Sequence, residues 1–325
     1  MHAERLLLGP GPSNPYPEAM EALVRPVLGH LDPDLLAVAR EIADRLRQVF
    51  QTTNRLTLPV SGTGSAGMEA CLVSLLEPGD IAIVGVNGYF GERLCEVARR
   101  AGATVQRVEA PWGSALDAEA LLAAQRRTPE ARLVAVVHAE TSTGVRNEVA
   151  PLLALQETDT LFVLDAVTSL GGIPVEVDGW GVDACYSATQ KCLGAPPGLA
   201  PVTLSERAAA RVAGRSAPPA SFYLDLNLLD AYLNDPHRYH HTISASLLYA
   251  LHAGLGQVLA EGLKAVWERH ARVGEQLQGV LPGIGYELLA AEGHRLPQLT
   301  TARLPEGVDD AAGRTVLREE FGIEV

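Results

Sequence analysis

Lys191 and Asp165 are the two side chains whose sequence settings best suit chemistry. Lys191 follows a short, largely apolar run and precedes a loop of small residues, 194–198. A lysine taken out of water loses its proton more readily and can then form a Schiff base. Asp165 ends the apolar run 161–164, and α/β sheets bind ligands at the carboxyl ends of such strands. Taken singly, a surface lysine and a loop-capping aspartate remain the commoner explanations.

The glycine-rich segment SGTGSAG at 61–67 is the third candidate, because it follows a predicted strand and opens a predicted helix. Its GxGxxG spacing suits a dinucleotide, but that interpretation needs an acid at the end of the next strand, which is Gly85-Val86-Asn87. No Lys-Ser or Lys-Thr pair follows, so it is not a P-loop. The hydroxyls of Thr63 and Ser65 suit a phosphate monoester at a helix N-terminus. A plain strand-to-helix turn remains open.

Together the three candidates match one cofactor. Pyridoxal 5'-phosphate needs a phosphate cup, an acid for its pyridine nitrogen and a lysine for its aldehyde. The chain presents them in that order, with Asp165 and Lys191 26 positions apart. No metal is expected, because Cys71, Cys95, Cys185 and Cys192 form no CxxC pair or His-rich cluster.

Several stretches resemble one family over nearly the whole chain. They are LLLGPGPSN (6–14), SGTGSAGMEA (61–70), EPGDIAIVGVNGYFGER (77–93), HAETSTGV (138–145), LDAVTSLGGIPVEVDGWGVDACYSATQKCLGAPPG (164–198), SFYLDL (221–226) and YHHTISASLLYAL (239–251). Taken together, these runs are similar to the class V, fold-type I aminotransferases of the alanine–glyoxylate, serine–glyoxylate and serine–pyruvate group. The resemblance implies a pyridoxal-phosphate-dependent enzyme that works as a homodimer.

The resemblance also implies a role for each matching residue. Lys191 would bind the cofactor aldehyde, and Asp165 would pair with the ring nitrogen. The remaining positions are Val167 and Phe90 on the two faces of the ring, Thr63, Gly64, Ser65 and Gln190 at the phosphate, Thr141 at the phenolic oxygen, and Tyr239 and Thr242 at the phosphate of the neighbouring subunit. Family members often have Trp where Phe90 stands, so weaker stacking is expected. The family's carboxylate-binding Arg has no match in Arg303, Arg314 or Arg318, and the sequence is therefore expected to be incomplete.

The elements that position these residues follow from periodicity. Seven β-branched runs predict strands: 55–60, 81–86, 104–110, 132–138, 160–167, 184–189 and 199–205. Helical spacing appears at 65–76, 91–100, 117–125, 149–156, 246–281 and 309–321, whereas 215–241 is loop-rich and the final FGIEV starts a strand. This alternation predicts an α/β fold with a largely parallel sheet and helices on both faces. With the resemblance, we expect the pyridoxal-phosphate transferase fold type I with seven strands and a smaller α+β C-terminal domain. The predicted division is an N-terminal arm (1–14), a large domain (15–245) and a small domain (246–325).

Composition narrows the functional classes. The 325 residues contain 26 Lys and Arg against 39 Asp and Glu, a net charge of −13, which argues against nucleic-acid binding. No apolar run approaches the ~20 residues that span a bilayer. The N-terminus shows no secretory pattern, and we expect a reduced, cytoplasmic protein without a membrane partner.

The function expected from these features is ping-pong transamination from alanine or serine to glyoxylate or pyruvate, with Lys191 as the general base. One alternative is a cysteine desulfurase or lyase on the same fold, but no cysteine follows Cys192 to act as its nucleophile. Others are an NAD-dependent oxidoreductase that uses GTGSAG and a cofactor-binding protein without catalysis.

Overall fold

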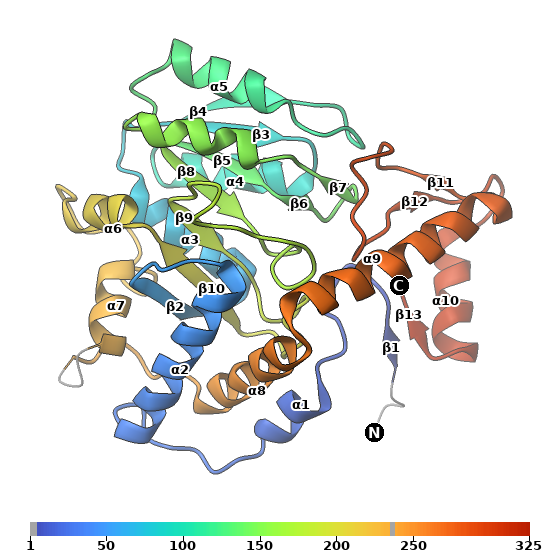
Figure 1. Cartoon of the computed structure of the whole chain (residues 1–325), viewed down its shortest axis with the longest axis horizontal. Coiled ribbons are helices and arrows are strands. Elements are labelled where there is room, and N and C mark those ends of the chain that lie inside the picture. Colours follow the sequence, from blue (N-terminus) through green and yellow to red (C-terminus); the bar gives the residue numbers. More distant parts are fainter. Residues whose placement is uncertain (1–4, 235–237) are drawn as a thin grey trace.

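The structure is a computed structural model that describes residues 5–234 and 238–325 (Figure 1). The first four residues of the predicted N-terminal arm, 1–14, lie outside the described residues. Within the described residues, none of the helices combines the length and the apolar character needed to cross a membrane.

A seven-stranded sheet forms the centre of the molecule, in the order β2-β10-β9-β8-β5-β3-β4. Neighbouring strands run parallel, except that β10 is antiparallel to both β2 and β9. The strands are β2 (Leu56–Ser61), β3 (Ile81–Val86), β4 (Thr104–Glu109), β5 (Leu133–Val137), β8 (Leu161–Asp165), β9 (Ala184–Tyr186) and β10 (Leu199–Leu204). Each coincides with one of the seven predicted runs, so the predicted fold class is confirmed.

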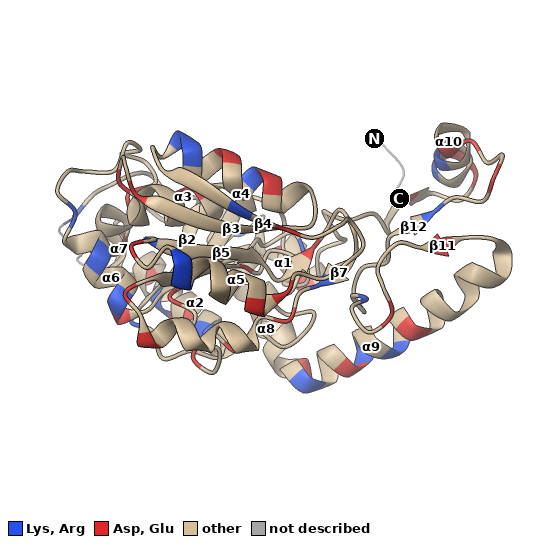
Figure 2. Ribbon diagram, turned by 90° about the horizontal axis from the view of Figure 1, so that it is seen from above, with Lys and Arg blue, Asp and Glu red and all other residues tan. Residues whose placement is uncertain are grey.

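Helices cover both faces of this sheet, as Figure 2 shows. Helices α3 (Gly64–Leu75) and α4 (Tyr89–Arg100) lie on one face, whereas α2 (Pro33–Phe50), α5 (Ala118–Arg127) and α8 (Ala245–Glu261) lie on the other. Every residue of β5 and of β8 is buried. Strands that are apolar on both sides require such double cover.

Helix α2 was not predicted, although its sequence carries the usual signals. The Asp32 side chain accepts a hydrogen bond from the Asp34 N–H (2.9 Å), and Pro33 occupies the first turn. Its buried residues recur at three- and four-residue spacing from Leu35 to Phe50. The helix ends at Gln51, which adopts a left-handed φ of 53°.

The structure corrects three predicted elements. The single helix expected over 246–281 is two helices, α8 and α9 (Leu263–Val280), because Gly262 between them has a φ of 86°. The helix expected over 149–156 is the 3₁₀ helix η1 (Ala150–Glu157). The stretch 215–241, predicted as loop, contains α7 (Leu226–Asn234). Helices α1 (Pro17–Ala22) and α6 (Glu206–Ala213) were also unassigned.

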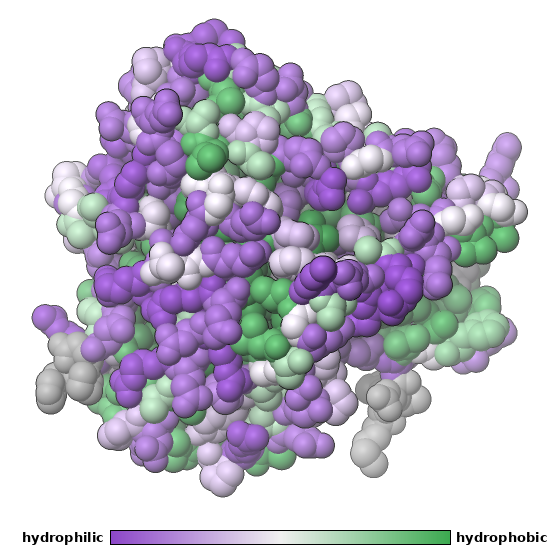
Figure 3. All heavy atoms as spheres, viewed as in Figure 1, coloured by the Kyte–Doolittle hydropathy of each residue, from purple (hydrophilic) through white to green (hydrophobic). Residues whose placement is uncertain are grey.

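The C-terminal part lies beside the sheet and contacts the N-terminal segment. It contains η2 (Leu281–Ile284), β11 (Glu287–Leu288), β12 (Ala302–Arg303), α10 (Asp310–Glu320) and β13 (Ile323–Glu324). The helix predicted at 309–321 and the final strand are therefore present. Strand β1 (Leu6–Leu7) pairs in parallel with β13. Apolar surface gathers over α10 in Figure 3, where Val316 and Phe321 are exposed. The domain boundaries at residues 14 and 245 stay a prediction.

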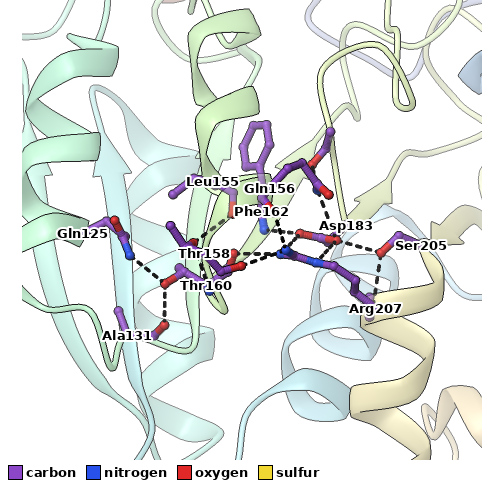
Figure 4. A network of polar contacts seen from close by, with 12 residues as sticks. Gln125, Ala131, Leu155, Gln156, Thr158, Thr160, Phe162, Asp183, Ser205 and Arg207 are labelled. Carbon is purple, nitrogen blue, oxygen red and sulfur yellow. Dashed lines mark hydrogen bonds and ion pairs between the residues drawn. The ribbon is translucent and has the colours of Figure 1, made fainter.

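A buried carboxylate holds the start of β9, the strand that leads to Lys191 (Figure 4). Asp183 is fully buried and accepts hydrogen bonds from the Phe162 N–H (2.9 Å) and the Ser205 hydroxyl (2.7 Å). The Arg207 guanidinium forms an ion pair with the same carboxylate at 2.9 Å. Because every charge in this network is paired, the network fixes β9 between its neighbours without leaving an isolated charge in the core.

Candidate active site

A cavity of about 290 Å³ lies where β2, β8 and β9 end. Eight of the eleven residues predicted for the site line this cavity: Thr63, Gly64, Ser65, Phe90, Asp165, Val167, Gln190 and Lys191. The sheet explains this convergence, because β8 and β9 are parallel neighbours and place Asp165 opposite Tyr186. Segments that are distant in sequence therefore meet at one edge.

Lys191 projects from the loop after β9 toward the N-terminal segment. Its Nζ donates a hydrogen bond to the Pro10 carbonyl oxygen. Burial lowers the pKa of Lys191, which favours the neutral amine. Gly11 follows at a φ of 124°, and a Cβ there would lie 2.6 Å from Nζ. The N-terminal segment is therefore a wall of the site that requires glycine.

Asp165 is held by two donors. The Val167 N–H donates to Oδ1 and the Tyr186 hydroxyl donates to Oδ2, both at 2.8 Å. Burial raises the pKa of Asp165 to about 6, although these two hydrogen bonds act in the opposite direction. Tyr186 was not predicted as a site residue. The sequence around Tyr186 carries no signal for this role. Only the pairing of β8 with β9 places Tyr186 opposite Asp165.

The start of α3 forms a cup of neutral donors. The N–H groups of Ala66 and Gly67 bond to the Thr63 carbonyl oxygen (2.8 and 3.3 Å). The N–H groups of Gly64 and Ser65 have no hydrogen-bond acceptor among the described residues. A Cβ on Gly64 would lie 2.9 Å from Val167, so glycine lets the helix approach that side chain closely. These free donors at a helix N-terminus suit an anion.

Phe90 is positioned by a second buried carboxylate that the sequence did not reveal. Glu140, at the end of β6 (Ala139–Glu140), is fully buried and accepts hydrogen bonds from the N–H groups of Phe90 and Gly91 (each 3.2 Å). The Ser142 hydroxyl donates to the same carboxylate at 2.6 Å. The carboxylate therefore stabilises the N-terminus of α4 and orients the residue proposed to stack on the ring.

Three predicted residues do not line the cavity. Thr141 is buried, and its hydroxyl pairs with the Thr168 hydroxyl. Tyr239 and Thr242 are exposed, and their hydroxyls lie 3.4 Å apart. Within one chain, the structure does not bring Tyr239 or Thr242 to the cavity.

A second cavity, of about 480 Å³, shares Gly11 and Lys191 with the first. Arg269 and His270 of α9 line it. The Arg269 guanidinium already forms two hydrogen bonds with Glu261, at 2.7 and 2.8 Å. Arg303, Arg314 and Arg318 line neither cavity; they pair instead with Glu287, Asp310 and Glu319, in that order. No metal-binding group of three or more His, Cys, Asp or Glu occurs among the described residues.

A lysine, an aspartate and an anion cup therefore meet at the strand ends of a mainly parallel sheet. The family profile described as aminotransferase class-V matches residues 14–325. The chain belongs to this family.

Three relatives show the extent of the similarity. The solved structure of alanine–glyoxylate aminotransferase from Nostoc sp. is 45% identical with a TM-score of 0.97, and the match covers 100% of this chain and 86% of that one. The (S)-ureidoglycine–glyoxylate transaminase of Bacillus subtilis is 36% identical over 99% of this chain and 82% of its own length. The alanine–glyoxylate aminotransferase of Drosophila melanogaster is 38% identical over 99% and 83%. These names favour the transaminase over the desulfurase and oxidoreductase alternatives.

Proposed function

We propose that this transaminase uses pyridoxal 5'-phosphate to move an amino group from a small amino acid, alanine or serine, to glyoxylate or pyruvate in a ping-pong reaction. The observation that carries the proposal is the meeting of Asp165, Lys191 and the neutral cup in one cavity. Transfer to glyoxylate is supported by the activities for which the Nostoc, B. subtilis and D. melanogaster relatives are named.

The residues present fit this cofactor. When bound, it supplies an electron sink for the bonding pair released at the substrate's α-carbon. The backbone N–H groups of Gly64 and Ser65 have no acceptor among the described residues, so they can donate to the phosphate of this cofactor. The proposed contacts are Asp165 at the ring nitrogen, Val167 and Phe90 at the ring faces, Thr141 at the phenolic oxygen, and Thr63, Gly64, Ser65 and Gln190 at the phosphate.

Lys191 has two tasks in the proposed reaction. Its amine would hold the cofactor aldehyde in the resting enzyme, and the free amine would take the proton from the substrate's α-carbon. The lowered pKa of Lys191 serves both tasks, because only the neutral amine is a nucleophile or a base. Asp165 keeps a proton on the ring nitrogen by its negative charge, which requires its ionised form.

The decisive test of the cofactor site is chemical. The sequence contains only two lysines, Lys191 and Lys264, and Lys264 is 87% exposed beside Glu268. Borohydride treatment of the purified yellow protein should fix a pyridoxyl group on Lys191 alone, and a mass-spectrometric peptide map would locate it. A label on Lys264, or no label, would contradict the proposal.

A half-reaction assay identifies the donor and the acceptor within the proposed class. A panel of alanine, serine and ureidoglycine as donors, with glyoxylate and pyruvate as acceptors, would be followed by the visible absorbance of each half-reaction. We expect the amino group to reach glyoxylate with at least one of these donors. Failure of every pair, in protein that carries the label on Lys191, would contradict the proposed substrates and leave the proposed cofactor in place.

We further propose a cytoplasmic homodimer in which Tyr239 and Thr242 bind the phosphate in the partner's site. The exposure of both residues supports this, because an exposed hydroxyl can reach another molecule. The net charge of −13 supports the expectation that nucleic acid is not a partner.

A further inference from the structure

The cofactor cavity contains a third charged side chain to which neither the sequence patterns nor the family resemblance gave a role. Arg93 of α4 lines the cavity together with Asp165 and Lys191. The Arg93 side chain is half-buried, so water solvates its positive charge only in part. A guanidinium keeps its positive charge at every pH at which the enzyme works.

Arg93 is held over the anion cup by its neighbours. One guanidinium nitrogen, Nη1, donates to the Ser65 hydroxyl oxygen at 3.1 Å, and Nη2 donates to the Tyr89 hydroxyl at 3.2 Å. The guanidinium carbon lies 4.9 Å from the centre of the Tyr89 ring and 5.0 Å from that of Phe90. Two hydrogen bonds and two aromatic faces therefore restrict its position beside Ser65.

Arg93 has no acidic partner among the residues that the structure describes. No carboxylate there lies within ion-pair distance of its guanidinium, whereas Arg107, which also faces α4, pairs with Glu92 at 2.5 Å. Glu140 enters the same region, but its oxygens accept from the backbone of α4 and from Ser142. A half-buried cation without a counter-charge is a site prepared for an anion.

The charges in the cavity leave one role for Arg93. A phosphate monoester carries about −1.5 to −2 at neutral pH. The cup residues Thr63, Gly64 and Ser65 are neutral, while Asp165 and Lys191 are assigned to the ring nitrogen and the aldehyde. We infer that Arg93 is the cationic ligand of the cofactor phosphate, acting on it directly and by orienting the Ser65 hydroxyl. This inference rests on the proposed cofactor.

Comparison of two ligands separates a phosphate role from a ring-stacking role. Pyridoxal has the ring and aldehyde of the cofactor but no phosphate. We expect Arg93→Gln apoenzyme to bind pyridoxal phosphate on the order of 10- to 100-fold more weakly than wild type, the scale of one charge-assisted hydrogen bond. Its affinity for pyridoxal should stay within about twofold, and Arg93→Lys, which keeps the charge, should lose less.

The matched control is Arg99→Gln, an exposed arginine in the last turn of the same helix. It should bind both ligands as wild type does. In the loaded proteins, ³¹P NMR should show that the pKa of the bound phosphate is higher in Arg93→Gln than in wild type, because a nearby positive charge favours the dianion.

Each contrary result has one meaning. Unchanged pyridoxal-phosphate affinity in Arg93→Gln would overturn the inference. Equal weakening of both ligands would also overturn it, since Arg93 would then only support Phe90 under the ring. If wild-type apoenzyme fails to bind pyridoxal phosphate, the proposed function itself is wrong and the inference falls with it.

Discussion

At the scale of single residues, the site depends on charges that burial makes costly. Asp165 is 3% exposed and Lys191 is half-buried, and burial shifts the pKa of each toward its neutral form. The proposed cofactor reverses this for Asp165, because a protonated ring nitrogen is a positive partner that stabilises the carboxylate. A charged Asp165 is thus less favourable in the apoenzyme than in the loaded enzyme.

Replacement of Asp165 by Asn tests the cost of burying this charge in two ways, through kcat of the loaded enzyme and through the stability of the apoenzyme. In the loaded enzyme, kcat should fall by at least ~100-fold, the scale of one well-placed electrostatic group. In the apoenzyme, the raised pKa means that the folded protein holds its proton up to a pH of about 6, whereas the unfolded chain releases it near 3.8. The stability contributed by the protonated form is therefore lost as pH rises from about 4 to 6.

Apoenzyme Asp165→Asn should consequently be more stable than wild type at pH 8, on the order of 1–3 kcal/mol, with the difference vanishing near pH 4. Thermal unfolding at several pH values would measure it. A near-native kcat would reduce Asp165 to a structural cap, and a pH-independent stability difference would contradict the role given to burial.

Tyr186→Phe should weaken catalysis through Asp165. The lost hydroxyl donates to Oδ2 at 2.8 Å, so its removal should raise the pKa of Asp165 further and lower kcat about tenfold, as expected for a hydrogen bond to a charged group. The absorbance of the bound cofactor should then titrate at higher pH than in wild type. Tyr249→Phe is the matched control, since its buried hydroxyl has no partner among the described residues. Identical titrations in all three proteins would refute a positioning role for Tyr186.

At the scale of elements, the short strand β6 connects two parts of the site. It ends at Glu140, which caps α4, and the next residue is Thr141. Strand β7 (Val145–Arg146) closes the hairpin and contacts the C-terminal part through a bridge between Val145 and Arg295. The hairpin thus connects Phe90 with the region beyond α9.

Glu140→Gln should lower both stability and cofactor affinity. It keeps one acceptor but removes a buried charge that binds helix N–H groups, so the free energy of unfolding should fall by about 1–2 kcal/mol. Looser placement of Phe90 should weaken pyridoxal binding as well as pyridoxal-phosphate binding, unlike the loss of Arg93. Glu148→Gln, which breaks only an exposed pair with Arg146, should change stability by less than about 0.5 kcal/mol. Equal effects of the two substitutions would show that Glu140 is not a brace.

At the scale of the whole molecule, one chain leaves apolar groups exposed near Tyr239. Tyr239 is 60% exposed and Phe222 is 68% exposed, and the Phe222 ring lies 4.8 Å from that of His240, the residue after Tyr239. We expect these exposed aromatic rings to be covered in the proposed dimer. A two-fold dimer would make both proposed active sites equivalent and shared.

Complementation tests the shared site. Lys191→Ala and the double variant Tyr239→Ala/Thr242→Ala should each have little activity alone. In mixed dimers, one site of the two would combine an intact Lys191 with an intact loop, so co-refolding should restore activity beyond the sum of the separate variants. Titration against the mixing ratio would measure this. A monomer by sedimentation, or no gain on mixing, would contradict the dimer.

The sequence alone predicted the strands of the central sheet and the main site candidates, because the patterns that indicate them lie within short stretches of the chain. The seven strands followed from runs of apolar residues, and the order of the 61–67 segment, Asp165 and Lys191 along the chain indicated a cofactor site only when the three were taken together. Helical periodicity was a weaker guide where a single backbone angle decides the outcome. Gly262 divides the predicted 246–281 helix by a positive φ that the spacing of apolar residues does not reveal.

Only the tertiary structure decided which groups support those residues. Glu140 meets the backbone of Phe90 from 50 positions away, and Lys191 meets Pro10 across 181 positions. Tyr186 and Arg93 likewise have roles only because they contact residues on other elements, Asp165 and Ser65 respectively. A buried carboxylate or an unpaired cation cannot be recognised from its own sequence context, because its energy depends on the solvent it loses and the partners it gains when the chain folds.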